Sequence, residues 1–231
     1  MAQIISIDGN IGSGKSTIVQ RLKEYFEKQN KNIIFLQEPV DEWDKIKDKN
    51  GITILEKFYK NQEKYSFAFQ MMAYISRLSM LKKTIEENPE SIIITERCLN
   101  TDRYVFAKML YDSGKLEDVE YQIYLNWFDH FSNMKGIHKV IYLKTNPDIC
   151  FYRINKRNRD GESNISLEYL ENCHKYHEEM IIMIMNKFND NTNLKTECDN
   201  VLIIDSNIDT NEMSNIIDEW INNISNFIEN K

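Results

Sequence analysis

The stretch IISIDGNIGSGKST, residues 4 to 17, decides the fold. Its first four residues form an apolar run that predicts a buried strand. Two glycines separated by four residues follow, Gly9 and Gly14, and then Lys15 and Ser16. Glycines let the backbone curl so that its N–H groups face phosphate oxygens, while Lys15 neutralises charge and Ser16 can ligate Mg²⁺. The stretch therefore predicts a P-loop between a strand and a helix.

A glycine-rich turn that merely joined a strand to a helix would not require a lysine and a serine at these positions. A P-loop leaves the phosphate acceptor open, because several classes of nucleotide-using enzyme share it. GTPases usually carry an Asn-Lys-x-Asp segment after a later strand, and the sequence has none. We expect the whole loop to bind ATP through Gly9, Asn10, Ile11, Gly12, Ser13, Gly14, Lys15, Ser16 and Thr17.

Strand and helix patterns alternate along the rest of the chain. Apolar runs rich in Ile and Val predict further strands, and segments with helical periodicity separate them. Alternation of this kind is typical of an α/β protein, here with a five-stranded parallel sheet flanked by helices. No Pro/Gly/Ser-rich linker divides the 231 residues, so we expect one domain spanning 1–231. The further strands are expected at 32–36, 91–95, 139–143 and 200–204, and the helices at 15–29, 52–87, 101–134, 147–157, 166–188 and 210–228.

Composition narrows the class of partner. The formal net charge is −7, and no basic block could neutralise a run of phosphates, which disfavours a nucleic-acid polymer as ligand. No apolar run approaches the length of a membrane span, and the N-terminal residues resemble no signal or transit segment. The four cysteines are too scattered for a metal motif or a disulfide framework. These features predict a cytoplasmic protein with reduced thiols.

Charged residues follow the second and third predicted strands. Glu38, in QEPVDEW, lies where open α/β sheets bind ligands and can accept the proton of an attacking hydroxyl, with Trp43 close behind. Glu96 and Arg97 end SIIITER, where Glu96 could hold the waters of Mg²⁺ and Arg97 could stabilise a transferring phosphoryl group. The alternatives are an exposed loop glutamate for Glu38 and a structural ion pair for Glu96 and Arg97.

The segment 52–87 carries Tyr59, Gln70 and Arg77 at spacings close to three and two helical turns. One continuous helix would project all three from a single stripe that lines a pocket. A glutamine offers a donor and an acceptor together, which suits the edge of a nucleobase, and Phe69 and Phe106 could stack on it. Periodicity alone equally allows the aromatic residues to belong to the core.

Basic residues cluster after Pro147. Arg153 and Arg157 lie one helical turn apart, and Arg159 follows in RINKRNRDG. A solvated basic helix end is the ordinary interpretation. In a phosphotransferase such arginines can also close over the phosphates of ATP as a lid, which excludes water. We expect a lid at about 153–165.

Five motifs taken together resemble the deoxyribonucleoside kinase family, especially its branch of deoxycytidine, deoxyguanosine and deoxyadenosine kinases. They cover nearly the whole chain in the family's order: GNIGSGKST, EPVDEW, FAFQMMAYISR, TERCLNTDRYVFA and RINKRNRDGESNISLEYLENCH. The resemblance implies a P-loop kinase fold, ATP and Mg²⁺ as cofactors, and a homodimer. It also implies transfer of the ATP γ-phosphoryl group to the 5′-hydroxyl of a deoxynucleoside, a step of nucleotide salvage.

Residue roles follow from the same resemblance. The family's general base falls on Glu38, its nucleobase ligand on Gln70, and its ligands to the sugar 3′-hydroxyl on Tyr59 and Glu162. Cys98 departs from the pattern, because relatives commonly carry serine there. The implied catalytic residues are Glu38, Arg97 and Lys15, the implied ligands of ATP outside the P-loop are Arg153, Arg157 and Arg159, and the implied metal residues are Ser16 and, through water, Glu96. The implied substrate residues are Glu38, Trp43, Tyr59, Phe69, Gln70, Arg77, Arg97, Asp102, Phe106 and Glu162.

Members that prefer cytosine or purines resemble this chain in pairing an arginine with an aspartate, here Arg77 and Asp102. Both groups can satisfy the amino- or oxo-bearing edge of those bases, whereas the methyl group of thymine would press against them. We therefore expect deoxyadenosine, deoxyguanosine or deoxycytidine as substrate. The alternatives are a thymidylate-like monophosphate kinase, a broad-specificity kinase that accepts thymidine, and a regulatory module that binds ATP without phosphoryl transfer.

Overall fold

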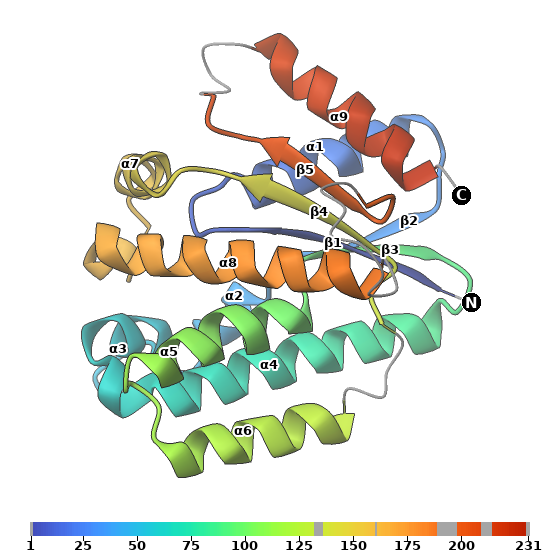
Figure 1. Ribbon diagram of the computed structural model, residues 1–231. Helices are drawn as coiled ribbons and strands as arrows, with labels where there is room; N and C mark the ends of the chain where they lie inside the picture. The colour runs from blue at the N-terminus through green and yellow to red at the C-terminus, as the bar shows by residue number, and fades with distance from the viewer. Residues whose placement is uncertain (1, 132–135, 160, 189–197, 209–213, 230–231) are drawn as a thin grey trace.

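The computed structural model describes residues 2–131, 136–159, 161–188, 198–208 and 214–229. Five parallel strands form one sheet in the order β2-β3-β1-β4-β5 (Figure 1). The α/β class and the five strands predicted from the sequence are therefore confirmed. The strands are β1 (Gln3–Gly9), β2 (Ile33–Leu36), β3 (Ile92–Glu96), β4 (Lys139–Lys144) and β5 (Val201–Asp205).

Helices cover both faces of the sheet. In Figure 1 α1 and α9 lie above it, α4, α5 and α8 lie below it, and α6 forms the lowest layer. Their bounds are α1 (Lys15–Lys28), α2 (Val40–Trp43), α3 (Ile54–Lys60), α4 (Gln62–Glu87), α5 (Lys108–Asp112), α6 (Asp118–Phe131), α7 (Pro147–Arg157), α8 (Leu167–Phe188) and α9 (Ser214–Glu229). A π-helix, η1 (Thr101–Ala107), precedes α5, and a 3₁₀ turn, η2 (Glu162–Asn164), precedes α8. None of these described helices combines the length and the apolarity that a bilayer span requires.

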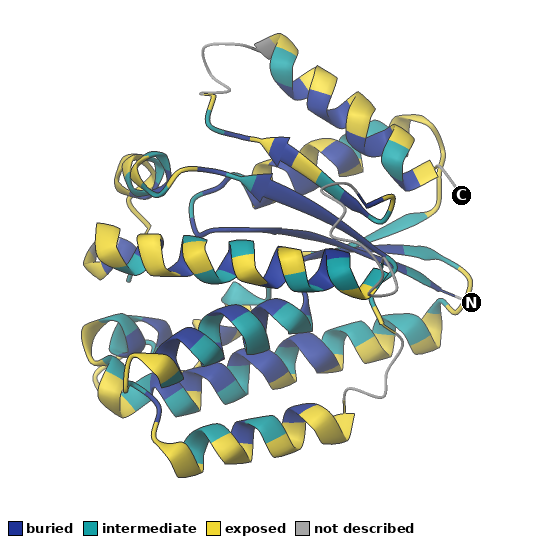
Figure 2. Cartoon of the chain, in the orientation of Figure 1, coloured by how far each residue is buried: buried dark blue, intermediate teal, exposed yellow. Residues whose placement is uncertain are grey.

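Strand alternation assigns neighbouring side chains of β1 to opposite faces. Ile5 and Ile7 pack with α1 and α9 in a fully buried core, with Leu22 of α1 and Ile224 of α9 at its centre. The side chain of Asp8 points the other way, toward η1, whose Thr101 it contacts. Figure 2 shows the inner strands buried and the outer helix faces exposed, as expected for a parallel sheet covered on both sides.

The predicted helix at 52–87 is wrong as one element, because it is broken at Asn61. Asn61 has φ −150° and ψ 82°, ends α3, and caps α4 by accepting a hydrogen bond from the Lys64 N–H at 3.2 Å. An asparagine side chain that satisfies an orphan N–H favours such a restart. The single stripe of Tyr59, Gln70 and Arg77 therefore does not exist, since Tyr59 lies on α3 and the other two lie on α4.

The predicted helix at 101–134 is divided as well, into η1, α5 and α6. Gly114, at φ 69°, closes the last turn of α5 with a hydrogen bond from its N–H to the Tyr111 carbonyl. A positive φ is readily adopted by glycine, so the chain turns there before α6. Residues 132–134 of this predicted helix and residues 210–213 of the last one lie outside the described part of the chain.

Candidate active site

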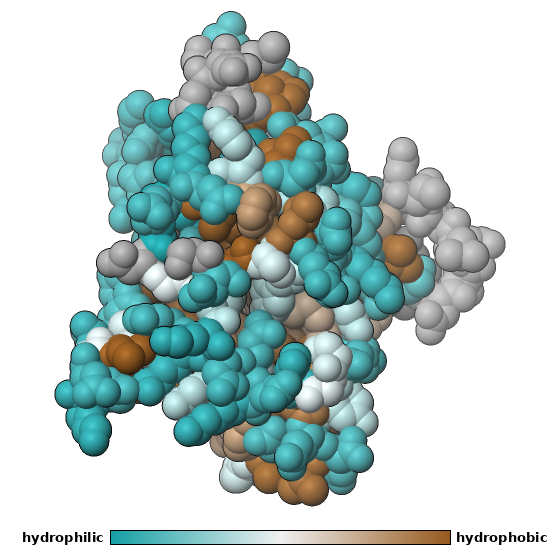
Figure 3. Space-filling model, turned by 90° about the vertical axis from the view of Figure 1, so that its left-hand side faces the viewer, coloured by the Kyte–Doolittle hydropathy of each residue, from teal (hydrophilic) through white to brown (hydrophobic). Residues whose placement is uncertain are grey.

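The carboxyl ends of β1, β2 and β3 meet at one edge of the sheet, which is the edge that faces the viewer in Figure 3. The P-loop leaves β1 at Gly9, whose φ is 151°. A Cβ atom at Gly9 would lie 2.7 Å from the Leu143 carbonyl oxygen, so only glycine fits this turn. The loop then passes directly into α1, whose N-terminus points its free N–H groups toward the site.

Lys15 is buried at the start of α1. Its Nζ donates a hydrogen bond to the Asn10 carbonyl oxygen at 2.6 Å and lies 3.5 Å from the Ser13 Oγ. Burial, reinforced by the nearby Arg97, lowers the pKa of Lys15 from 10.5 to about 7. An anion bound in the loop would reverse this effect, so the ammonium group is suited to phosphate.

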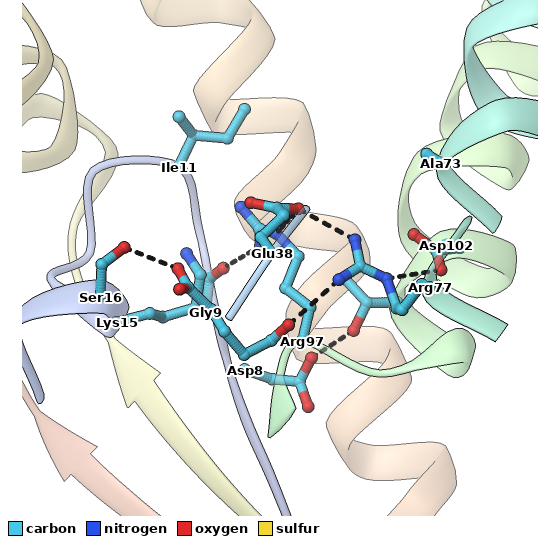
Figure 4. A network of polar contacts seen from close by, with 12 residues as sticks. Asp8, Gly9, Ile11, Lys15, Ser16, Glu38, Ala73, Arg77, Arg97 and Asp102 are labelled. Atoms are coloured by element: carbon cyan, nitrogen blue, oxygen red, sulfur yellow. Dashed lines mark hydrogen bonds and ion pairs between the residues drawn. The ribbon is translucent and has the colours of Figure 1, made fainter. Parts of the chain in front are cut away.

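Two arginines hold the carboxylate of Glu38. Its Oε1 accepts hydrogen bonds from Arg77 Nη2 at 2.9 Å and from Arg97 Nε at 3.3 Å (Figure 4). Burial alone would raise the pKa of Glu38, but Arg97, Arg77 and Lys15 outweigh it and lower the pKa to about 2. Glu38 is therefore ionised at neutral pH and can accept a proton or a hydrogen bond from a ligand, since its side chain keeps 20% of its surface exposed.

Arg77 ties three elements together. Besides Glu38, its Nε donates to Asp102 Oδ2 at 2.9 Å and its Nη1 donates to the Glu96 carbonyl oxygen at 3.1 Å. Asp102, on η1, is buried, and this burial raises its pKa despite the opposing Arg77 charge. A fully buried ion pair is costly to desolvate, and both partners of this pair line the cleft.

Arg97 lies between the phosphate loop and Glu38. Its φ is 62°, a left-handed conformation that is uncommon outside glycine, and its Nη1 donates to the Gly9 carbonyl oxygen at 2.7 Å. Its guanidinium group covers the ring of Phe106 at 5.1 Å from the ring centroid. Backbone strain at a residue held on several sides is frequent at functional sites.

Ser16 and Glu96 form the oxygen-rich corner of the site. The Ser16 Oγ donates to Glu96 Oε1 at 2.7 Å, between α1 and the end of β3. A hydroxyl and a carboxylate are the hard oxygen donors that Mg²⁺ prefers, often through water. These two side chains therefore fit a magnesium ion bound beside the P-loop.

One cleft joins all these groups. It encloses about 900 Å³, including its open mouth, and the P-loop forms one wall while α3, α4 and η1 form the other. At the Gln70 end, Gln70 is buried and its Oε1 has no hydrogen-bond partner within the described structure. The predicted residues that line this cleft are Ile11, Gly12, Gly14, Lys15, Ser16, Thr17, Glu38, Trp43, Tyr59, Phe69, Gln70, Arg77, Glu96, Arg97, Asp102, Phe106, Arg157, Arg159 and Glu162.

Three predicted P-loop residues serve the loop itself. Asn10 is buried and donates a hydrogen bond from Nδ2 to the Leu170 carbonyl oxygen on α8 at 2.9 Å. Gly9 offers its carbonyl oxygen to Arg97, and Ser13 is buried beside Lys15. Tertiary contacts thus fix the loop in its curled form.

The predicted lid arginines divide between two places. Arg157 and Arg159 both form ion pairs with Glu162, at 3.6 Å in the case of Arg159, and line the cleft. Arg153 instead donates from Nη2 to the carbonyl oxygens of Ser206 and Ile208, at 2.9 and 2.8 Å. Arg153 lines a second groove together with Gly12, Gly14 and Thr17 of the P-loop, and Arg157 lines both this groove and the cleft. Asp160, within the predicted lid, lies outside the described residues.

Phe69 belongs to the core and also lines the cleft. Its ring stacks on Phe58 at 4.5 Å and meets Trp43 edge-on at 5.6 Å, so it belongs to a core cluster. The same ring lines the cleft. The sequence reasoning missed five other wall residues, namely Val40, Leu55, Phe58, Ala73 and Tyr169. Three of them occur in the motifs that resemble the family, Val40 in EPVDEW, Ala73 in FAFQMMAYISR and Tyr169 in LEYLENCH, and that was the available signal.

Comparison with known proteins shows the family. Residues 5–229 match the model of the deoxynucleoside kinase family. Human deoxycytidine kinase is 35% identical over 198 residues, which are 77% of this chain and 75% of the human protein. A fowlpox virus protein named probable deoxycytidine kinase is 34% identical over 217 residues, 93% of this chain and 86% of the viral protein.

A third relative, human mitochondrial thymidine kinase 2, is 34% identical over 181 residues, 78% of this chain and 64% of the human protein. The match of the family model extends from β1 to α9 and so includes every element that contributes to the cleft. A phosphate loop, a clamped carboxylate and a polar-ended cleft in one chain are what phosphoryl transfer to a nucleoside requires. The chain therefore belongs to the deoxynucleoside kinase family and is an ATP-dependent nucleoside kinase.

Proposed function

We propose that this enzyme transfers the γ-phosphoryl group of ATP to the 5′-hydroxyl of a deoxynucleoside that carries cytosine, adenine or guanine. The observation that carries the proposal is the buried Arg77–Asp102 pair on one wall of the cleft, with Gln70 close by on α4. The two side chains of the pair expose 4% and 2% of their surfaces. A ligand that reaches them must therefore match their hydrogen bonds.

Gln70 and Asp102 supply complementary groups for a base. The unpartnered Oε1 of Gln70 accepts, its amide N donates, and the Asp102 carboxylate accepts from an exocyclic amino group. A polar site of this kind rejects a ligand that leaves its groups unpaired, because each buried polar group without a hydrogen-bond partner costs about 1–3 kcal/mol of binding free energy. Thymine presents a methyl group where the favoured bases present polar or small groups, so thymidine is disfavoured.

The catalytic roles follow from position and charge. Glu38 orients the 5′-hydroxyl and receives its proton, which suits a loose transition state that needs positioning more than a strong base. Arg97 and Lys15 stabilise the charge on the phosphoryl oxygens, and Arg157 and Arg159 close over them. Glu162 is buried and Tyr59 is half-buried, and both line the cleft, where they hold the sugar 3′-hydroxyl.

Magnesium is assigned to Ser16 and, through water, to Glu96. When bound it neutralises charge between the phosphates of ATP and supplies electrostatic stabilisation. Ser16 offers its hydroxyl oxygen and Glu96 keeps its carboxylate next to it at 2.7 Å. This chain then needs no further metal ligand, since Mg²⁺ usually keeps several waters.

Steady-state kinetics with ATP and Mg²⁺ test the proposal. We expect kcat/KM for deoxycytidine, deoxyadenosine or deoxyguanosine to exceed that for thymidine by at least about tenfold. Equal or higher kcat/KM for thymidine would favour the activity named for thymidine kinase 2 and would overturn the base assignment. Including dAMP and dTMP in the same assay separates a monophosphate kinase, because Glu38 would repel an acceptor that is already anionic.

We also propose a homodimer in the cytoplasm. The four cysteines are free and buried, which suits a reducing compartment. Large apolar side chains are exposed on α4 and α6, namely Ile75, Ile123, Trp127 and Phe131. Figure 3 shows hydrophobic surface, in brown, at its lower end, which is the height at which α6 lies in Figure 1. An exposed apolar patch of this kind is typical of an interface between subunits.

A further inference from the structure

A buried acid in β1 lies outside the cleft. Asp8 is fully buried and does not line the pocket, although it directly precedes the P-loop. Its Oδ2 accepts a hydrogen bond from the Ser6 Oγ at 2.6 Å. No arginine, lysine or histidine among the described residues forms an ion pair with it. A buried carboxyl group held by neutral donors is costly, so its place needs a physical reason.

Both remaining donors to Asp8 come from the segment that begins η1. The Thr101 Oγ1 donates a hydrogen bond to Asp8 Oδ1, and the Cys98 Sγ contacts the same oxygen at 3.7 Å. Burial and the Asp8 carboxylate raise the pKa of the Cys98 thiol, so it remains a weak donor. Thr101 is therefore the principal attachment of η1 to β1.

This attachment lies next to the base-recognition pair. Thr101 is the first residue of η1, and its N–H donates to the Cys98 carbonyl oxygen at 3.0 Å. Asp102 is the next residue and bonds Arg77, while Phe106 lies one turn further along. A π-helix is rare and is frequently found at functional sites. The first turn of η1 is held by contacts with other elements, including the hydrogen bond from Thr101 to Asp8 of β1.

Resting on the proposed function, we infer that Asp8 is a positioning residue for nucleobase recognition. Its carboxyl group holds Thr101, and thereby the first turn of η1, so that Asp102 meets Arg77 at the end of the cleft. Asp8 itself touches neither substrate. Because it lies one residue before Gly9, the same side chain ties the phosphate loop to the element that recognises the base.

Thr101→Val tests this role, since it removes one hydroxyl and nearly keeps the shape. We expect KM for deoxycytidine to rise about tenfold and the ratio of kcat/KM for deoxycytidine over thymidine to fall, with KM for ATP unchanged. Thr101→Ser restores the hydroxyl and should restore both values. Thr84→Val makes the same change near the C-terminal end of α4 and should leave KM for deoxycytidine and the ratio of kcat/KM at the wild-type level.

A second variant covers the case in which Thr101→Val does not fold. Asp8→Asn keeps the size but offers one acceptor oxygen in place of two, so it should shift the same ratio in the same direction. Loss of thermal stability with an unchanged nucleoside ratio, or equal changes for ATP and nucleoside, would overturn the inference. Wild-type enzyme that turned over no deoxynucleoside would instead overturn the proposed function, and the two failures are thus distinct.

Discussion

At the scale of single residues, the site is defined by one carboxylate between two arginines. Glu38 follows β2, Arg77 comes from α4 and Arg97 from the end of β3. Each guanidinium group has a second anchor, since Arg77 binds Asp102 and Arg97 binds the Gly9 carbonyl. The arginines are therefore preorganised, and Glu38 is the partner with exposed surface that a substrate can engage.

Glu38→Gln should lower kcat by about 10²- to 10⁴-fold, the range for loss of a positioned acid–base group. The amide keeps the size but cannot receive a proton, while the rest of the cleft stays intact. Initial rates at saturating ATP and deoxycytidine measure the effect, and thermal melting checks the fold. Glu42→Gln, on the exposed side of α2, is the matched control and should leave kcat unchanged. A rate for Glu38→Gln within threefold of wild type would require another base.

Because of Lys15, the binding of ATP should be accompanied by the uptake of a proton. Its pKa of about 7 in the free enzyme means that most of the amine is neutral at pH 8.5. Bound phosphates raise that pKa, so binding must take up close to one proton above pH 7 and little below it. Calorimetry of ATP binding in buffers of different ionisation enthalpy measures this uptake.

The lowered pKa of Lys15 also makes the stability of the folded protein depend on pH. Between pH values of about 7 and 10.5, the unfolded chain binds more protons at Lys15 than the folded one. The contribution of Lys15 to the free energy of unfolding therefore rises with pH across that window.

In the calorimetric experiment, Lys15→Met should abolish the proton uptake on ATP binding, and Lys23→Met, on the exposed face of α1, should retain it. Identical uptake in all three proteins would assign the proton to a different group.

At the scale of elements, the break at Asn61 decides how the cleft is walled. Helical periodicity continues across it, which is why the sequence pattern predicts one helix. The chain turns because the Asn61 side chain satisfies an N–H of α4. The turn lets Tyr59 meet Tyr169 edge-on at 6.1 Å, while Gln70 faces the cleft from α4.

Asn61→Ala should destabilise the protein by about 1 kcal/mol, because it removes the N-terminal cap of α4. It also favours helix across the break, so we expect KM for deoxycytidine to rise as Tyr59 is displaced. Urea unfolding and steady-state kinetics measure the two effects. Asn61→Asp retains a capping oxygen and should stay close to wild type in both. Loss of stability with an unchanged KM would mean that the cap and the pocket are independent.

At the scale of the whole molecule, the order β2-β3-β1-β4-β5 brings three distant segments to one edge. Glu38, Glu96 and Gly9 end or follow three adjacent strands, and parallel pairing places those ends together. The helices below the sheet then add the walls that recognise the nucleoside. In the outer layer, α6 carries apolar side chains that are exposed and do not pack against the sheet.

Trp127→Asp should convert the proposed dimer into monomers. Trp127 exposes 43% of its surface and stacks on Phe131, so a charge there would be buried without a partner in a dimer interface. Sedimentation velocity over a range of concentrations measures the change. Ile182→Asp, at an exposed apolar position on α8, is the control and should leave the assembly unchanged. A wild-type protein that sediments as a monomer would overturn the proposed dimer.

Features that depend on neighbouring residues could be predicted from the sequence. Apolar runs buried on both faces predict strands, and GNIGSGKS predicts the curled loop, because glycine geometry and strand length are set by neighbouring residues. The sequence also placed Glu38, Glu96 and Arg97 at strand ends. The contacts between side chains could not be predicted in this way: Arg77 bridges Glu38 and Asp102, Arg153 lines a second groove, and Asp8 holds Thr101. Those contacts join residues far apart in the chain, and their energies depend on burial and charge that periodicity does not encode.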